Sequence, residues 1–397
     1  MDFGLSPDQE LLQRSAAEFL AAECPPALVR EVATSEDGVP RALYGKMAAL
    51  GWLGLIVPEK FGGAGLGMLD LALLCEPIGA SVVPGPFFSS AVLATLALLH
   101  GGSAAQKTHW LPRLAAGDAF GALALLEESD WLAGAGVVAR ARQRGAGKSG
   151  TGKSSSGKSS TGKSSTEWTL SGTKLFVLDA HVADVLIAAF RTGGRGEDGV
   201  TLFLVPRDAP GVEVLPLPSV DVTRRLAEVR FTQVEVPAAA VLGAPGAGWR
   251  TLARVLDGAA VALAADSLGG AQRAFDMAVA YCGVRQQFGR TIGSFQAIKH
   301  MAAEMASEIE PARALLWYAG YAADALPRQA PRAASMAKAC LGDVYSRVVN
   351  RAVQMHGGIG FTWEHDLHFW FKRAKWNELA YGDVAWHRER VAALSKY

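Results

Sequence analysis

The stretch of sequence that decides the fold runs from Leu268 to Met305 and reads LGGAQRAFDMAVAYCGVRQQFGRTIGSFQAIKHMAAEM. Apolar residues recur in it at intervals of three and four, which is typical of amphipathic helices. One series comprises Ala271, Phe275, Ala278, Val279 and Cys282, and a second comprises Phe295, Ile298, Ala302 and Met305. The spacing therefore predicts two helices with a connection between them.

The connection between the two predicted helices is short, basic and rich in glycine. It contains Arg285, Gln287, Phe288, Gly289, Arg290 and Gly293. Glycine permits backbone conformations that bring amide and guanidinium groups close to an anionic ligand. A bound diphosphate would fit such a turn.

Two blocks of residues carry a resemblance to a known family. The first block reads Tyr281-x-x-x-Arg285-x-x-Phe288-Gly289-x-x-Ile292-x-x-Phe295-Gln296. The second reads Gln354-Met-His-Gly357-Gly358-Ile-Gly360-Phe361. Both resemble segments of the acyl-CoA dehydrogenases, flavoenzymes that oxidise the Cα–Cβ bond of an acyl thioester. The resemblance extends from Leu5 to the last residue, apart from one insertion.

The resemblance implies FAD as cofactor and assigns residues to it. Within one subunit, FAD would be contacted by Arg285, Phe288 and Gln296, with the arginine helping to hold its diphosphate. From a neighbouring subunit, the cofactor would be approached by Gln354, Gly357 and Gly358. If the flanking motif were absent, simple helix packing would be the better explanation for Phe288 and Gln296.

The resemblance also implies a fold and partners. The fold is α+β, with an N-terminal helical domain over residues 1–118, a central β domain over 119–245 and a C-terminal four-helix bundle over 246–397. The expected partners are an acyl-CoA substrate, an electron-transfer flavoprotein as acceptor, and further subunits that build a tetramer, either a homotetramer or a heterotetramer with a related subunit.

Hydrophobic patterning read from the residues alone indicates the same three parts. Ser6 can cap a first helix in which Pro7 suits the first turn, and helical patterns continue to about Gly117. Short β-branched or alternating runs separated by Gly, Pro and Asp follow from Ala119. Helical patterns return from Gly246, so the predicted order is helical, β, helical.

Composition is that of a globular protein and excludes several classes. Of 397 residues, 50% are hydrophobic and 19% charged, and the net charge of +1 gives no reason to expect nucleic acid or an anionic membrane as partner. The four cysteines are far apart and lack metal-type spacing, so a disulfide framework or a zinc site is not expected. With no signal-like segment at the acidic N-terminus, the expected location is cytoplasmic.

The segment from Gly145 to Thr166 is a low-complexity insertion in the β domain that repeats Gly-Lys-Ser. A phosphate-binding loop with that tripeptide needs a preceding apolar strand and a following helix, and the tract supplies neither. We therefore expect residues 145–166 to form a long surface loop without a catalytic role.

The catalytic base is where the sequence departs from the family pattern. Most members carry a Glu directly after an aromatic residue near the C-terminus, and the corresponding run here, Ala380-Tyr-Gly-Asp-Val384, places Gly382 at that position. Other members carry the Glu at a site that matches Ala259. The nearest replacement carboxylate is Asp383, whose alternative role is a helix cap. Weaker candidates for the base are Asp257, Glu378 and His387. Of these, the histidine is expected to lie on the surface.

A second departure concerns the flavin. Two threonines that would donate hydrogen bonds to it are replaced by Leu126 and Leu178. Leucine cannot donate a hydrogen bond, so flavin binding within this subunit is expected to be weaker or altered.

The cluster Trp363-Glu-His-Asp-Leu-His368 is rich in groups that could bind a metal. Flavin dehydrogenation needs no metal, so we expect structural hydrogen bonds there and no metal site.

The favoured function is FAD-dependent α,β-dehydrogenation of an acyl thioester, in fatty acid or lipid metabolism. One alternative is a non-catalytic partner subunit of a heteromeric acyl-CoA dehydrogenase. Another is a flavin oxidase or carrier-protein-linked dehydrogenase that uses Asp383 as base. The sequence does not reveal the length or branching of the acyl chain.

Overall fold

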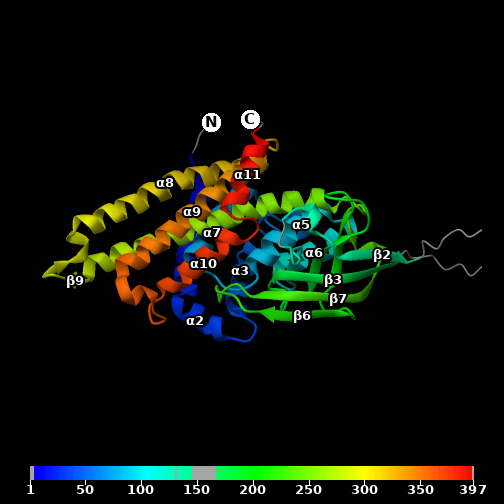
Figure 1. Cartoon of the computed structure of the whole chain (residues 1–397), viewed down its shortest axis with the longest axis horizontal. Coiled ribbons are helices and arrows are strands. Elements are labelled where there is room, and N and C mark those ends of the chain that lie inside the picture. The colour runs from blue at the N-terminus through cyan, green and yellow to red at the C-terminus, as the bar shows by residue number, and fades with distance from the viewer. Residues whose placement is uncertain (1–3, 130–131, 145–166, 396–397) are drawn as a thin grey trace, which may run out of the picture.

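The computed structural model describes residues 4–129, 132–144 and 167–395. Helices form one part, a β-sheet follows, and long helices complete the chain (Figure 1). This order confirms the predicted α+β fold with an N-terminal helical part, a central sheet and a C-terminal helical bundle. The predicted loop 145–166 lies outside the described residues.

The N-terminal part is helical. Its α-helices are α1 (Pro7–Glu23), α2 (Pro26–Thr34), α3 (Arg41–Ala49), α4 (Met68–Ala80), α5 (Thr95–Gly101) and α6 (Ala104–Ala116), and a π-helix spans Phe87–Ala94. Ser6 caps α1 as predicted, because its hydroxyl accepts a hydrogen bond from the Gln9 backbone N–H at 3.2 Å. Gly51 follows α3 with a φ of 77°, a left-handed conformation that suits glycine after a helix.

The central part is a sheet of eight strands. They are β1 (Gly121–Ala124), β2 (Arg140–Arg144), β3 (Glu167–Leu178), β4 (Val185–Arg191), β5 (Val200–Pro206), β6 (Val212–Leu217), β7 (Leu226–Pro237) and β8 (Val241–Leu242). Their order is β6-β7-β3-β2-β4-β5-β8, and β1 pairs in parallel with β4. The β-branched runs at 168–170 and 174–178 belong to one long strand, β3, and irregularities in its pairing with β7 interrupt the alternation between them.

The C-terminal part consists of long helices joined by tight turns. They are α7 (Gly248–Val284), α8 (Gln296–Ala325), α9 (Ala330–His356), α10 (Leu367–Leu379) and α11 (Val384–Leu394). A small hairpin, β9 (Gln286–Gln287) with β10 (Arg290–Thr291), joins α7 to α8, and the 3₁₀ turn Gly357–Phe361 follows α9. Figure 1 shows this hairpin at one end of the molecule and the sheet at the other.

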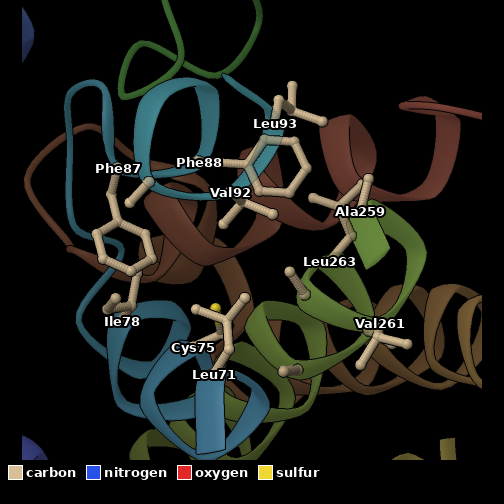
Figure 2. Packing of buried hydrophobic residues seen from close by; sticks show 14 of the residues in the cluster. Leu71, Cys75, Ile78, Phe87, Phe88, Val92, Leu93, Ala259, Val261 and Leu263 are labelled. Atoms are coloured by element: carbon tan, nitrogen blue, oxygen red, sulfur yellow. The ribbon is translucent and has the colours of Figure 1, made fainter. Parts of the chain in front are cut away.

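Helix α7 crosses α4 at very short range. A Cβ added to Gly269 would lie 1.8 Å from the Glu76 carbonyl oxygen, and one added to Gly79 would lie 2.0 Å from that of Asp266. Only glycine fits at both positions, so the two backbones approach closely. Around this crossing, α4, the π-helix and α7 pack their apolar side chains together, as Figure 2 shows for Cys75, Phe88, Leu263 and their neighbours.

Contacts between the two ends of the chain close the fold. Arg30 of α2 forms an ion pair with Asp366 at 2.7 Å, and its guanidinium lies over the Phe369 ring. The Trp370 indole N–H donates to the carbonyl oxygen of Ala80, at the end of α4. The N-terminal helices are therefore completed by residues near the C-terminus.

No helix in the described ranges combines the length and the apolar character needed to span a bilayer.

Candidate functional site

The predicted anion-binding turn is a two-residue hairpin with an unusual backbone. Its central residues Phe288 and Gly289 have φ values of 54° and 76°, as in the turns that match strand twist in tight hairpins. A positive φ is strained for a bulky aromatic residue. The Phe288 side chain is nevertheless 92% exposed, so packing within the chain does not explain this strain.

The side chains around this hairpin include exposed polar groups and a small cluster of rings. Arg285 and Gln296 are exposed, while the Arg290 guanidinium stacks on the Phe295 ring at 4.1 Å. Phe295 also contacts the Phe288 ring edge-on at 6.1 Å. Cation–π and edge-to-face contacts of this kind hold the hairpin in one shape and leave Arg285 available to a ligand.

A second turn lies at the same end of the helical bundle. The Tyr281 ring at the end of α7 stacks on the His356 ring at the end of α9, with centroids 4.5 Å apart. Gly357 follows with a φ of 67°, and a Cβ at Gly357 or Gly358 would meet nothing within 4 Å. Gln354 is exposed beside them. The structure thus brings both predicted cofactor blocks to one end.

The two turns carry groups that could hold an anionic ligand. Arg285 supplies a guanidinium for an anion, and the open glycine backbone at 357–358 allows close approach. Asp266 and Arg285 are 19 positions apart along α7 and its cap, a span of roughly 28 Å at 1.5 Å per residue. The hairpin is therefore remote from the buried middle of α7.

A buried cluster of charges lies where the sheet, α7 and α10 meet. Arg373, fully buried, binds Asp221 through Nε at 2.6 Å and Asp266 through Nη1 at 3.0 Å. Asn377 donates to the second oxygen of Asp266 at 2.7 Å. Because each charge has an opposite partner in a low-dielectric setting, this charged junction fixes the sheet against the helices.

Arg224 belongs to the same junction but is less completely paired. Its Nη2 lies 3.2 Å from Asp266, and its guanidinium lies over the rings of Phe88 and Trp376. Its Nε and Nη1 are buried without a hydrogen-bond partner among the described residues. Burial, and next the Arg373 charge, lower the pKa of Arg224.

Asp179 faces this region from the end of β3. Its carboxylate accepts a hydrogen bond from the Ser89 hydroxyl at 2.6 Å. Burial raises the pKa of Asp179, against the effects of that hydrogen bond and of Arg224. Directly before it, Leu178 is 1% exposed, so a predicted flavin-contacting position lies inside this apolar and charged region.

The sheet carries a second buried ion pair and an open groove. Lys174 lies 2.6 Å from Glu127, whose carboxylate also accepts from the backbone N–H of Ala139 at 3.0 Å. Burial lowers the pKa of Lys174 to about 8, although the carboxylate opposes this. Beside the pair is a groove of about 1520 Å³, lined among others by Glu127, Ser129, Arg140, Arg142, Ser171 and Gln233.

The structure gives Asp383 the role of a helix cap. Its Oδ1 accepts a hydrogen bond from the Trp386 backbone N–H at 2.7 Å, and the residue is exposed. This is the alternative role expected for it, and its role as base stays a prediction. The segment before it bends sharply, because Tyr381 and Gly382 have φ values of 56° and 102°.

Two buried basic side chains hold this bend, which we call the Tyr381–Gly382 turn. The Lys338 ammonium, 1% exposed, donates to the Gly382 carbonyl oxygen at 3.1 Å. His387 donates from Nε2 to the Tyr381 carbonyl oxygen at 3.2 Å, and its Nδ1 contacts the Ser335 hydroxyl. The expectation that His387 lies on the surface is wrong: the ring is 1% exposed, because it packs inward beneath the turn.

The other candidate bases are engaged elsewhere. Asp257 forms an ion pair with Arg390 at 2.6 Å, and Glu378 accepts from the Ser346 hydroxyl at 2.9 Å. Ala259, the alternative base position, is fully buried.

The histidine-rich segment at 363–368 is built from ring contacts. The His368 ring stacks on Trp363 at 4.5 Å, while His365 accepts from the Leu367 backbone N–H. Within the described residues, no group of three or more His, Cys, Asp or Glu side chains could hold a metal ion.

Sequence reasoning missed several residues of the site. Arg224, Asp266 and Arg373 lie far apart along the chain and meet only in the fold. Lys338 gave a usable signal, because it shares one helical face with Ala334, Leu341 and Tyr345, which are all buried.

Comparisons with known proteins agree with this architecture. Family models described as the N-terminal, middle and C-terminal domains of acyl-CoA dehydrogenase match residues 6–118, 146–234 and 246–395. Acryloyl-CoA reductase (NADH) of Anaerotignum propionicum is 31% identical, over 99% of this chain and 95% of the relative. The probable acyl-CoA dehydrogenase YngJ of Bacillus subtilis is 32% identical, over 96% of each protein.

A solved structure shows the same fold. Butyryl-CoA dehydrogenase from Megasphaera elsdenii superposes with a TM-score of 0.88 at 26% identity, over 100% of both chains. Sequence and structure agree over the whole length, and the chain therefore belongs to the acyl-CoA dehydrogenase family, whose members are oxidoreductases that act on CH–CH donors.

Proposed function

We propose that the chain catalyses FAD-dependent α,β-dehydrogenation of an acyl thioester within an oligomer of such subunits. The observation that carries the proposal is the hairpin of Phe288 and Gly289, strained and exposed beside Arg285, at the end of the bundle where the 357–358 backbone is open. Backbone strain that no contact within the chain offsets is typical of a site that a ligand or a neighbouring subunit completes.

The residues of the chain divide the work between two places. At the hairpin, Arg285, Phe288 and Gln296, together with Gln354, Gly357 and Gly358, would hold the dinucleotide. The bound flavin supplies a hydride acceptor for Cβ. At the sheet, the groove beside Ser129, Arg140 and Arg142 offers hydroxyl and guanidinium groups to the phosphates of an acyl-CoA.

The proposed partners follow from the family. They are an acyl-CoA substrate, an electron-transfer flavoprotein as acceptor, and further subunits in a homotetramer or heterotetramer. We place the protein in the cytoplasm, which suits its four free thiols.

The decisive experiment is to purify the chain alone and record its flavin absorbance and its oligomeric mass. A yellow oligomer whose flavin is bleached by an acyl-CoA under anaerobic conditions supports the proposal. A colourless protein that neither gains flavin on addition of FAD nor on co-expression with a related subunit contradicts it.

A second candidate function is the non-catalytic partner subunit of a heteromeric enzyme. Leu178 favours it, because this buried leucine stands where the family pattern has a hydrogen-bond donor to the flavin at the chain's own sheet. The residues of the hairpin, in contrast, match the family pattern. Co-expression with a related subunit tests it. The complex should then contain one flavin for every two subunits, and the Arg285→Met variant of this chain should lose flavin from the complex. Both results together would show that the hairpin serves the companion's cofactor.

The variant Leu178→Thr separates the two functions. If the chain binds flavin at its own sheet, the restored hydroxyl raises the affinity for FAD. In a pure partner subunit, the buried hydroxyl only lowers stability, by about 1–3 kcal/mol, since it replaces an apolar group in the core.

A further inference from the structure

Tyr381 directly precedes Gly382, the position of the missing base, and its side chain packs against the hydrophobic core. The Tyr381 ring packs against Phe88 with centroids 5.8 Å apart. The next residue after Phe88 is Ser89, whose hydroxyl binds Asp179, and Asp179 directly follows Leu178. The Asp179 carboxylate also raises the pKa of Tyr381, so the tyrosine lies near the end of β3, close to Leu178, a position that the resemblance assigns to a flavin contact.

The Tyr381–Gly382 turn is held in a strained shape from three sides. Lys338 of α9 binds the Gly382 carbonyl oxygen, His387 of α11 binds that of Tyr381, and Asp383 caps α11. A left-handed φ is costly for tyrosine, by about 1–3 kcal/mol, and such strain concentrates at functional positions. The turn fixes where the tyrosine side chain points.

We propose that Tyr381 is the residue of this chain that exchanges a proton with Cα of the acyl thioester. The inference rests on the proposed function, because it needs an acyl thioester bound at the end of β3. It assigns to the tyrosine the role for which the sequence alone suggested Asp383.

The proton transfer balances in both directions. When the phenolate acts as base, the Cα–H bond breaks, the proton passes to the tyrosine oxygen, and the electron pair remains as an enolate delocalised onto the thioester oxygen. In reverse, the hydroxyl gives its proton to the Cα of the enolate and becomes phenolate. Exchange with solvent through these two steps requires no oxidant or reductant.

The surroundings of Tyr381 decide which form predominates. Burial and the Asp179 carboxylate raise the pKa of Tyr381, against the Arg224 guanidinium. Among the described residues, Lys338 lies below Gly382 and His387 lies below Tyr381. The charges of Asp383, Glu378 and Arg390 act on these two groups in turn. The hydroxyl is therefore protonated at neutral pH, and only a small phenolate fraction acts as base.

This protonation state gives Tyr381 a signature that a carboxylate lacks. Below the pKa, the phenolate fraction grows about tenfold for each pH unit. Exchange through a carboxylate base with an ordinary pKa would instead be nearly independent of pH between 7 and 9, because such a group is already ionised there.

The test measures, by mass spectrometry, how fast deuterium from D₂O enters Cα of butyryl-CoA and of longer acyl-CoAs. The protein is used loaded with flavin, either as purified alone or as its complex with a co-expressed subunit. We expect the rate, corrected for that of protein-free controls, to rise about tenfold per pH unit from 7 to 9. Tyr381→Phe should lose about a hundredfold or more of it, the usual contribution of a positioned acid or base. Asp383→Asn should keep both rate and slope.

A matched variant guards against misfolding. Tyr381→Glu places a carboxylate on the same turn, and its exchange should become independent of pH over this range. A flat profile in the unmodified protein, a Tyr381→Phe variant that keeps its rate, or exchange abolished by Asp383→Asn would each overturn the inference.

Failure of the proposed function gives a different result. The same samples are assayed for flavin content by absorbance and for acyl-CoA binding by calorimetry. Protein that binds both but shows no exchange overturns only the role of Tyr381, whereas protein that binds neither flavin nor acyl-CoA overturns the proposed function and this inference with it.

Discussion

The charged junction and the Phe288–Gly289 hairpin place charges in opposite ways. At the junction, Arg373 is fully buried and bonded to two aspartates of distant segments. At the hairpin, Arg285 is exposed on a turn whose aromatic tip lies 92% in solvent. Both regions are built on α7, yet the first buries its charges among partners of the same chain and the second exposes its charge to solvent.

The difference separates charges that support the fold from charges that are available for binding. A buried pair pays a large desolvation cost that only its partners offset, so removing one partner leaves an uncompensated charge. An exposed arginine contributes little to stability, and its guanidinium is free to bind a phosphate. Substitutions in the two regions should therefore change different measured quantities.

The largest effect is expected at the junction. Arg373→Met leaves Asp221 and Asp266 buried without their main cation, and we expect the free energy of unfolding to fall by about 3–5 kcal/mol. Urea unfolding measures it. Arg230→Met, which removes an exposed ion pair with Glu228, is the matched control and should cost less than about 1 kcal/mol. Equal losses in the two variants would contradict the comparison.

Acid should weaken the turn that adjoins the junction. Burial lowers the pKa of His387 to about 3, below its ordinary value of 6.5. The unfolded chain therefore takes up this proton first, and stability falls as the pH drops from 6.5 towards 3, by up to about 1.4 kcal/mol per pH unit.

His387→Gln, which cannot titrate, should show a shallower loss of stability over that pH range. His300 is exposed on α8, so His300→Gln should leave the slope unchanged. Denaturant unfolding at a series of pH values compares the two variants, and parallel curves for His387→Gln and the unmodified protein would refute the prediction.

At the hairpin, a substitution should change binding and leave folding alone. Arg285→Met removes a charged hydrogen-bond donor, so we expect the affinity for FAD to fall about 10- to 100-fold. The free energy of unfolding of the flavin-free protein should change by less than about 0.5 kcal/mol. Arg328, exposed in the connection between α8 and α9, provides the control, since Arg328→Met should affect neither quantity.

The smallest effect on stability is expected at the tip of the hairpin. Phe288→Ala removes a side chain that packs little within its own chain, so unfolding should shift by less than about 0.5 kcal/mol. Assembly should weaken instead, seen as oligomers that dissociate at higher protein concentration in sedimentation. A large loss of stability without any change in assembly would show instead that Phe288 supports the fold of its own chain.

Local patterns predicted the elements of the fold well. Ser6 caps the first helix as predicted, and the spacing around Arg285 predicted two helices and a tight turn, because these signals depend on neighbouring residues. The π-helix of Phe87–Ala94 and the pairing of β3 were missed, because each depends on packing against distant segments.

The site was less predictable than the fold. The resemblance identified the hairpin residues, but the orientation of Tyr381 depends on Lys338 and His387, which approach it from other helices. The presence of Gly382 in the sequence shows directly that the base glutamate is missing. The inward orientation of the neighbouring Tyr381 side chain could not be predicted in this way.

The contact between Arg30 and Asp366 has a consequence for biosynthesis. A ribosome adds about 5–20 residues per second, so roughly 20 to 70 seconds pass between the synthesis of these two residues. During that time, the helix that carries Arg30 lacks the aromatic platform on which its guanidinium rests. The nascent chain completes its first helical layer only when its last helices emerge, and chaperones that shield apolar surfaces would have that interval in which to bind.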